Sequence, residues 1–112
     1  MAIRRYDMFG INDLTLEDAR SMVEKTLGFR FARRNSRLHG GTYYLYRLNT
    51  GKEYKLYSNF DATKSEWIQD HYKDYSILLS VSDLDNMDDI QKQIMASCKK
   101  TVLIGSSTIA NS

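Results

Sequence analysis

The feature that most constrains the fold is a pair of tyrosine-rich runs, residues 42–48 and 53–58, separated by Asn49-Thr50-Gly51-Lys52. Asn and Gly favour the backbone angles of short hairpin turns, and aromatic residues favour strands. Side chains alternate along a strand, so Tyr44 and Tyr46 should share one face of this hairpin. The pattern predicts an antiparallel β-sheet.

A first helix is predicted to end just before Gly28. Thr15 is a suitable N-cap and has an acidic residue, Asp18, three positions later. Gly28 suits the left-handed conformation that ends many helices. Between these signals, residues at spacings of three and four mark one buried stripe: Leu16, Ala19, Met22, Val23, Thr26 and Leu27.

The other segments predict more strands and a second helix. The helix covers residues 84–98, with one largely apolar side: Met87, Ile90, Ile94 and Cys98. Strands are expected at 3–11, 29–34, 76–81 and 101–105. Residues 58–75 are expected to form a long loop or one helical turn packed by Trp67, and residues 106–112 a loose tail.

The resulting order is β-α-β-β-β-β-α-β. It predicts an α+β fold in which a mostly antiparallel sheet of five to six strands carries two helices on one face. With 112 residues, the chain is long enough for a single domain over 1–112 and too short for two. We find no internal repeat and no low-complexity segment in the sequence.

Charge and cysteine content narrow the function classes. The formal net charge is only +2, yet residues 1–60 hold eleven Lys and Arg against six Asp and Glu, a balance of +5, and residues 61–112 hold five against eight, a balance of −3. This split predicts a basic face and an acidic face. Cys98 is the only cysteine, which rules out an internal disulfide and a multi-cysteine zinc site. No apolar run resembles a signal peptide or a membrane span, so we expect a cytoplasmic protein without a membrane partner.

The sequence offers little for catalysis. His39 and His71 are the only histidines, and neither has a metal ligand or nucleophile at a diagnostic spacing. Cys98 continues the apolar side of the second helix and is expected to be a buried, inert thiol. The acidic residues near the start of that helix suit its dipole and lack the pattern of a calcium loop: Asp83, Asp85, Asp88 and Asp89. We predict a protein that is not an enzyme and needs no cofactor or metal.

A basic run offers an alternative function. Residues 30–37 contain four arginines, Arg30, Arg33, Arg34 and Arg37, followed by tyrosines. Arginine beside stacking aromatic rings is typical of proteins that bind single-stranded nucleic acid. No ribonucleoprotein or KH signature accompanies the run, and the total charge is low. A small RNA-binding module is therefore the alternative prediction, and nucleic acid the less favoured partner.

The aromatic and charged residues between 43 and 75 favour a protein–protein interface. Tyr, Trp and Arg dominate such interfaces because they bury much area at a low entropic cost. Acidic side chains would steer a basic partner. For Trp67, packing at the edge of the core is the competing prediction. The candidate partner-binding residues are Arg34, Tyr44, Tyr46, Tyr57, Trp67, Asp70, His71 and Asp74.

Several short motifs in this layout resemble a known family. They are Leu27-Gly28-Phe29-Arg30-Phe31, Gly40-Gly41-Thr42-Tyr43-Tyr44, Ser58-Asn59-Phe60, Trp67, and Ile77-Leu78-Leu79-Ser80-Val81 before an acidic helix start. The chain resembles the small immunity proteins of bacterial contact-dependent growth inhibition and related polymorphic toxin systems.

The resemblance implies a cytosolic inhibitor that binds the toxic C-terminal domain of one cognate effector, often a nuclease, and blocks it without turnover. Many immunity proteins against basic nucleases are acidic, whereas this chain is mildly basic. Two alternatives follow for the contact. Either the acidic second half binds the toxin, or an acidic patch on the toxin meets Arg33, Arg34 and Arg37. The resemblance leaves open whether the protein forms homo-oligomers.

Overall fold

The computed structural model describes residues 2–37, 41–49, 51–61, 64–83, 86–98 and 100–111, with side chains described between Arg5 and Thr108. His39, Gly40, Thr50 and Asp85, which the sequence analysis singled out, lie outside these residues. The main elements are β1 (Ala2–Ile11), α1 (Leu16–Leu27), β2 (Ala32–Ser36), β3 (Gly41–Arg47), β4 (Glu53–Ser58), β7 (Ile77–Ser82), α2 (Met87–Ser97) and β8 (Thr101–Asn111). Their order confirms the predicted β-α-β-β-β-β-α-β arrangement.

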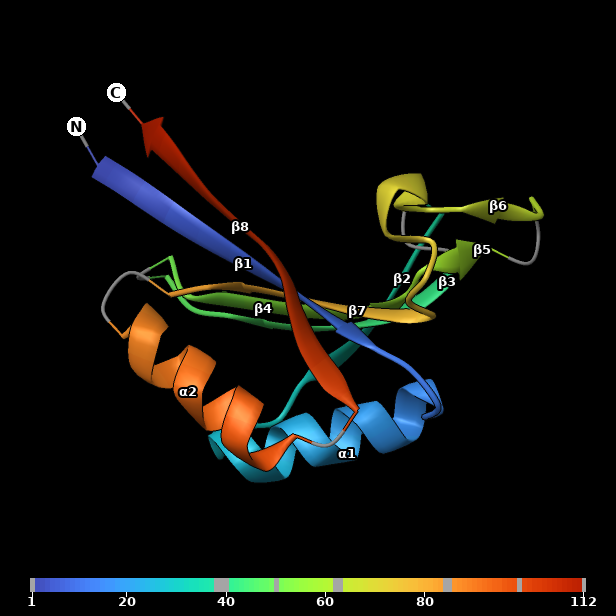
Figure 1. The fold of residues 1–112 in the computed structure, drawn as a ribbon, viewed down its shortest axis with the longest axis horizontal. Coiled ribbons are helices and arrows are strands. Elements are labelled where there is room, and N and C mark those ends of the chain that lie inside the picture. Colours follow the sequence, from blue (N-terminus) through green and yellow to red (C-terminus); the bar gives the residue numbers. More distant parts are fainter. Residues whose placement is uncertain are drawn as a thin grey trace.

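A six-stranded sheet forms the centre of the fold, with the strand order β2-β3-β4-β7-β1-β8. Each neighbouring pair is antiparallel. Both helices lie on the same side of this sheet, while the segment between β4 and β7 rises from the other side (Figure 1). The α+β prediction is therefore confirmed. Among the described helices, none combines the length and apolar character needed to cross a membrane.

The start and end of α1 follow from two residues. Thr15 Oγ1 accepts a hydrogen bond from the Asp18 backbone N–H at 3.0 Å, as an N-cap should. Gly28 adopts the left-handed conformation at φ 76°, and its N–H donates to the Glu24 carbonyl at 2.8 Å. Both predicted helix signals are confirmed.

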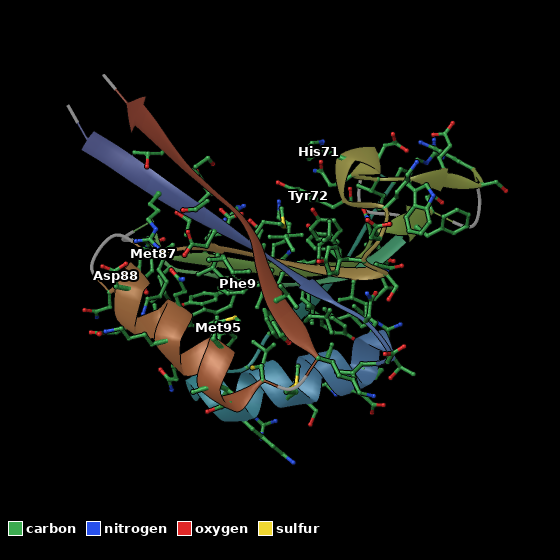
Figure 2. All side chains as sticks on the ribbon, in the orientation of Figure 1. Phe9, His71, Tyr72, Met87, Asp88 and Met95 are labelled. Carbon is green, nitrogen blue, oxygen red and sulfur yellow. The ribbon has the colours of Figure 1, made fainter. Side chains whose placement is uncertain are left out.

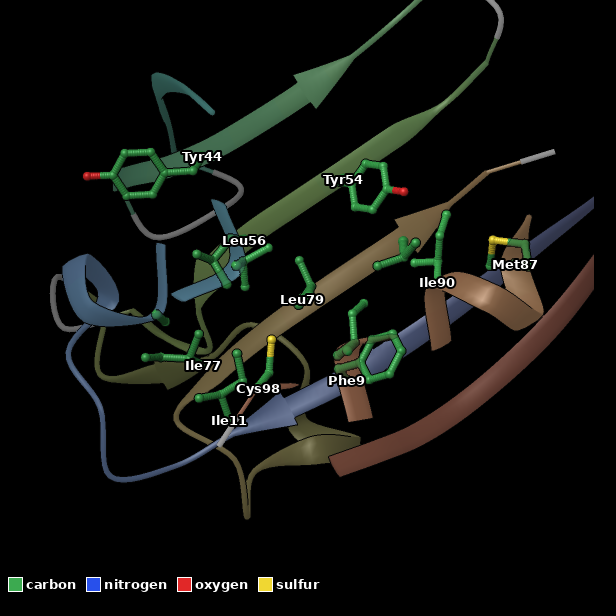
Figure 3. Close-up of a cluster of buried hydrophobic side chains, with 14 residues drawn as sticks. Phe9, Ile11, Tyr44, Tyr54, Leu56, Ile77, Leu79, Met87, Ile90 and Cys98 are labelled. Atoms are coloured by element: carbon green, nitrogen blue, oxygen red, sulfur yellow. The ribbon is translucent and has the colours of Figure 1, made fainter. Parts of the chain in front are cut away.

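The apolar core lies between the sheet and the two helices (Figure 3). The strand register places Phe9, Leu79 and Leu56 in one row across β1, β7 and β4, and all three are fully buried. The predicted side of α2, namely Met87, Ile90, Ile94 and Cys98, closes this core from below, since each is at most 9% exposed. Burial of these side chains is the main source of stability for the fold.

The predicted strand at 29–34 is displaced in the structure. β2 begins only at Ala32, because the Phe31 N–H donates to Glu24 Oε2 of α1 at 2.8 Å. Phe29 and Phe31 instead meet edge to face, with ring centroids 4.9 Å apart. Both rings pack against the core next to the helices. The hydrogen bond to α1 therefore takes the place of strand pairing at Phe31.

The prediction of a loose tail at 106–112 is wrong for residues 106–111. They form the second half of β8 and pair with β1, from Asp7↔Ser106 to Ala2↔Asn111. A β-bulge near Met8 and Phe9 shifts the register between the two halves. The sequence analysis did not consider pairing between the two ends of the chain. The backbone of β1 provides the strand partner for residues 106–111.

Candidate partner-binding surface

The chain from Asn59 to Ser76, here called the 59–76 segment, covers part of the sheet face opposite the helices (Figure 1). It contains a two-stranded sheet of β5 (Phe60–Asp61) and β6 (Glu66–Trp67), followed by the single 3₁₀ turn η2 (Asp70–Tyr72). The segment is neither the predicted long loop nor a helical turn alone, because a small hairpin precedes the turn. The predicted turn is present as η2, and Trp67 lies ahead of it in β6.

Asn59 holds this segment together from the inside. Its side chain is fully buried. Asn59 Nδ2 lies 3.3, 2.9 and 3.2 Å from the carbonyl oxygens of Gln69, Tyr72 and Tyr75, and Oδ1 accepts from the Gln69 N–H at 2.8 Å. Its backbone adds bonds to Ser76 and Ile68, both within 2.8 Å. One amide side chain therefore supplies what regular secondary structure would otherwise provide.

Two glycines let the segment lie close against the sheet. A Cβ atom on Gly10 of β1 would stand 2.4 Å from the ring of Tyr75, so only glycine leaves room for that ring. A Cβ on Gly105 of β8 would stand 2.7 Å from the Tyr72 hydroxyl oxygen. Tyr57 of β4 is 4% exposed, and burial is the main cause that raises its pKa. The tyrosine rings thus form the underside of the segment.

The outer side of the segment exposes two aromatic rings. Phe60 and Trp67 are cross-strand partners in the hairpin and remain 39% and 37% exposed. Their ring centroids are 5.1 Å apart at an interplanar angle of 71°, an edge-to-face contact. Trp67 is not among the residues packed against the main apolar core, and its ring meets that of Phe60.

Three further predicted residues lie beside this pair. Asp70, His71 and Asp74 are all exposed, within or just after η2. Figure 2 shows His71 and Tyr72 on the far side of the sheet from Asp88 and Met95 of α2. The position of Asp74 is supported by Asn12, whose Nδ2 donates to the Asp74 carbonyl at 2.9 Å. Trp67, Asp70, His71 and Asp74 are therefore all exposed along the same short segment.

Arg34 lies on the same face of the sheet but on its edge strand. The register aligns Arg34 of β2 with Tyr43 and, beyond it, with Tyr57, the residue under the 59–76 segment. The Arg34 side chain is exposed. It therefore lies on the same side of the sheet as the 59–76 segment, two strands away from Tyr57.

Tyr44 and Tyr46 point to the opposite face, toward the helices. Tyr44 is 4% exposed, its hydroxyl donates to Glu17 Oε1, and the guanidinium of Arg20 lies 5.5 Å from its ring centre. Tyr46 is half-buried and stacks on Phe29 with centroids 4.2 Å apart. These tyrosines, like Tyr57, belong to the packing of the domain, and we leave all three out of the proposed surface.

A polar pocket that the sequence analysis missed opens beside Tyr46. It has a volume of about 340 Å³ and is bordered by Phe29, Tyr54, Lys52 and Asp83. Asp83 Oδ2 lies 3.1 Å from Lys52 Nζ and accepts from the Tyr54 hydroxyl at 3.2 Å. Burial, and secondly the charge of Asp83, raise the pKa of Tyr54 well above its usual value. The hydroxyl therefore stays protonated and fixes the orientation of the carboxylate.

The reactive side chains weighed in the sequence analysis have ordinary surroundings. Cys98 is 5% exposed, and its thiol donates to Thr26 Oγ1 at 3.4 Å. Burial raises the pKa of that thiol, which lowers its thiolate fraction near neutral pH. Asp88 Oδ1 pairs with Arg5 at 2.6 Å. Within the described residues, no three His, Cys, Asp or Glu side chains are placed to share a metal ion.

Comparison of the chain with protein-family models and with curated proteins finds no match.

Proposed function

We propose that this protein is a non-catalytic binder that uses the 59–76 segment to occupy another protein, in the manner of an immunity protein that neutralises a toxic effector domain. The observation that carries the proposal is the Phe60–Trp67 pair, two large aromatic side chains left more than a third exposed on a segment held from inside by Asn59. A protein that acts by covering another protein needs such an exposed surface and needs no catalytic side chain.

The two aromatic side chains should lose little conformational entropy when a partner binds. Aromatic side chains give much buried area for few rotatable bonds and are enriched among the residues that dominate binding energy. The edge-to-face contact and the backbone pairing of Phe60 with Trp67 already restrict both rings before any partner arrives. Less conformational entropy is then lost on binding, so more of the contact energy remains as affinity.

The charges around the aromatic pair are mixed, and the acidic side chains are the more numerous by one. Glu66, Asp70 and Asp74 are exposed around the aromatic pair, with Lys64 and Lys73 interspersed. Nucleases bind a polyanion and carry basic surfaces. The three carboxylates would pair with basic side chains of such a domain at the rim of the contact, between Lys64 and Lys73. This reading favours the acidic second half of the chain as the contact, in place of Arg33, Arg34 and Arg37.

The test requires a candidate toxic domain, sought among the products of the genes next to this one, which is then co-expressed and purified with the protein. Trp67→Ala should weaken binding by about 30-fold or more, which corresponds to about 2 kcal/mol, and should reduce protection of the host cell. Met95→Ala is the matched control, because Met95 is 44% exposed on α2, on the other side of the sheet. Equal affinity for both variants would exclude the segment as the contact.

The single tryptophan provides a direct readout. If the toxin covers Trp67, its fluorescence should shift to the blue and become harder to quench with acrylamide. Asp70→Asn with Asp74→Asn should leave the fold intact, slow association and weaken protection. Unchanged protection at native expression levels would remove both acids from the contact.

The alternative, an RNA-binding module, is favoured by one observation: Arg30, Arg33, Arg34 and Arg37 are all exposed at or beside β2. A fluorescence titration with a single-stranded RNA oligonucleotide at low and moderate salt separates the two functions. Tight binding that weakens steeply with salt would favour RNA. An absence of binding at low salt would reject it.

A further inference from the structure

We infer that β8 is a self-association edge through which two copies of this chain pair their sheets, β8 against β8, about a two-fold axis. The inference is independent of the proposed function, because it concerns the edge of the sheet and not the 59–76 segment. It begins from a difference between the two edge strands, β2 and β8.

An open edge strand is a template for further strand pairing, and proteins protect such edges with charge, proline or short length. β2 has this protection, since it has only five residues and includes Arg33 and Arg34, both exposed. β8 has none of it. It runs for eleven residues, and the segment Thr101–Asn111 contains no charged residue and no proline.

Among the described strands, the outer half of β8 pairs with β1 alone, and Arg5 in that part of β1 is tied to α2 by bonds to Asp88 at 2.6 Å and Gln91 at 2.7 Å. β7 pairs with β1 only from Asp7 to Ile11, whereas β8 pairs with β1 as far as Ala2. Residues 2–6 and 107–111 therefore form a two-stranded ribbon, which extends past the rest of the sheet (Figure 1). An isolated two-stranded ribbon is marginally stable in water, and three or more strands are needed for independent stability.

A second copy of the chain solves this problem symmetrically. Antiparallel pairing of β8 with its counterpart would place four strands, β1-β8-β8-β1, where each copy alone has two. A two-fold interface brings a surface against itself, so a charged strand would face its own charge; β8 has none to repel. The β5–β6 hairpin lies away from this ribbon, so a dimer could present both hairpins (Figure 1).

The test is the mass of the purified protein in solution, measured by sedimentation equilibrium from about 1 µM to about 500 µM, the range in which a modest edge contact should respond to concentration. The monomer has a mass of 13.0 kDa, and we expect the mass to approach twice that value as concentration rises. Ser107→Lys and Val102→Lys each place a charge on β8, one in each half. Both side chains are exposed, so the fold should tolerate the change, which circular dichroism would verify.

Each lysine variant should raise the dimer dissociation constant about tenfold or more, because a charged edge resists pairing. Ser97→Lys is the matched control, since Ser97 is an exposed residue at the end of α2, and it should dimerise like the unmodified protein. A monomer at every concentration would overturn the inference. So would a dimer that both β8 variants leave unchanged, or one that Ser97→Lys weakens equally.

Discussion

The two faces of the sheet are stabilised by different means. On the helix side, apolar residues from β1, β4, β7 and both helices form one continuous core, so the stability of this face depends on many contacts. On the other side, the 59–76 segment is attached by a few directional contacts, chiefly the hydrogen bonds of Asn59 and Asn12, and by rings that lie over Gly10 and Gly105. The first face determines whether the chain folds, and the second determines where the exposed aromatic pair is presented.

This difference teaches that stability and the proposed binding function are physically separable here. Nonpolar burial is non-directional and spreads over many residues. Hydrogen bonds to one buried amide are directional, and the loss of a partner leaves the other groups unsatisfied. Substitutions on the helix side should therefore change global unfolding, while those around Asn59 should change the segment.

The largest loss of stability is expected at Phe9 on the helix side, and Phe60 on the other side serves as the comparison. Phe9→Ala, at a fully buried position, should lower the free energy of unfolding by about 4 kcal/mol through lost burial and a cavity. Phe60→Ala removes the same atoms from a ring that is 39% exposed and should cost less than about 1 kcal/mol. Urea denaturation measures both. Equal losses would show that the hairpin is part of the core.

A smaller and more local effect is expected at Asn59. Asn59→Ala should cost about 2 to 3 kcal/mol, because the Tyr75 carbonyl and the Gln69 N–H lose the Asn59 side chain as partner, while the carbonyls of Gln69 and Tyr72 keep one backbone bond each. Hydrogen exchange should accelerate in residues 64–76 far more than in β7. The exposed Asn49, in the turn after β3, is the control, and Asn49→Ala should stay within about 0.5 kcal/mol. Uniform acceleration across the sheet would contradict a separable segment.

The two glycines under the segment offer a graded test. Gly10→Ala should cost about 2 kcal/mol, since the new Cβ would overlap the inner part of the Tyr75 ring. Gly105→Ala should cost less, because its close contact is the hydroxyl at the far end of the Tyr72 side chain, which is easier to move. Thermal unfolding gives the stability order. A reversed order would mean that the segment does not rest on β1 as described.

The smallest effect concerns pH on the helix side. The Arg5 guanidinium, through its hydrogen bond and charge, holds the pKa of Asp88 below its usual value of 3.8. A carboxyl with a lowered pKa in the folded state stabilises the protein above pH 3.8 and loses this contribution as pH falls through the folded-state value.

The unmodified protein and Asp88→Asn should therefore differ in urea midpoint at pH 5 and converge as the pH drops below 3.8. Asp89→Asn, which changes the neighbouring acid on the same helix, is the control and should show no such convergence. A gap between the unmodified protein and Asp88→Asn that stays constant down to pH 3 would rule out the Arg5 pair as its cause.

Sequence patterns predicted those parts of the fold that depend on neighbouring residues. The N-cap at Thr15, the left-handed Gly28 and the hairpin across 42–58 each use local backbone preferences, and all are present. The strand predicted at 29–34 begins later, at Ala32, because the Glu24 side chain of α1 accepts the Phe31 N–H, a contact that the alternation of residues does not reveal. The tail at 106–112 failed because its strand partner lies near the other end of the chain.

The candidate surface divides in the same way. Aromatic and charged composition indicated Trp67, Asp70, His71 and Asp74, which the structure gathers on one segment. The same composition also indicated Tyr44 and Tyr57, which are 4% exposed. A tyrosine suits a core or an interface equally well, so composition does not separate the two roles. Exposure is decided by what packs against the residue.

By itself, the amino-acid sequence determined the class of fold, the two helices, the central hairpin and the lack of an internal disulfide, because these depend on local preference, periodicity or the number of cysteines. Only the tertiary structure decided which strand ends become open edges, which aromatic rings stay outside, and that Asn59 organises the segment carrying them. These features arise from contacts between residues far apart in the chain, and no local pattern encodes such contacts.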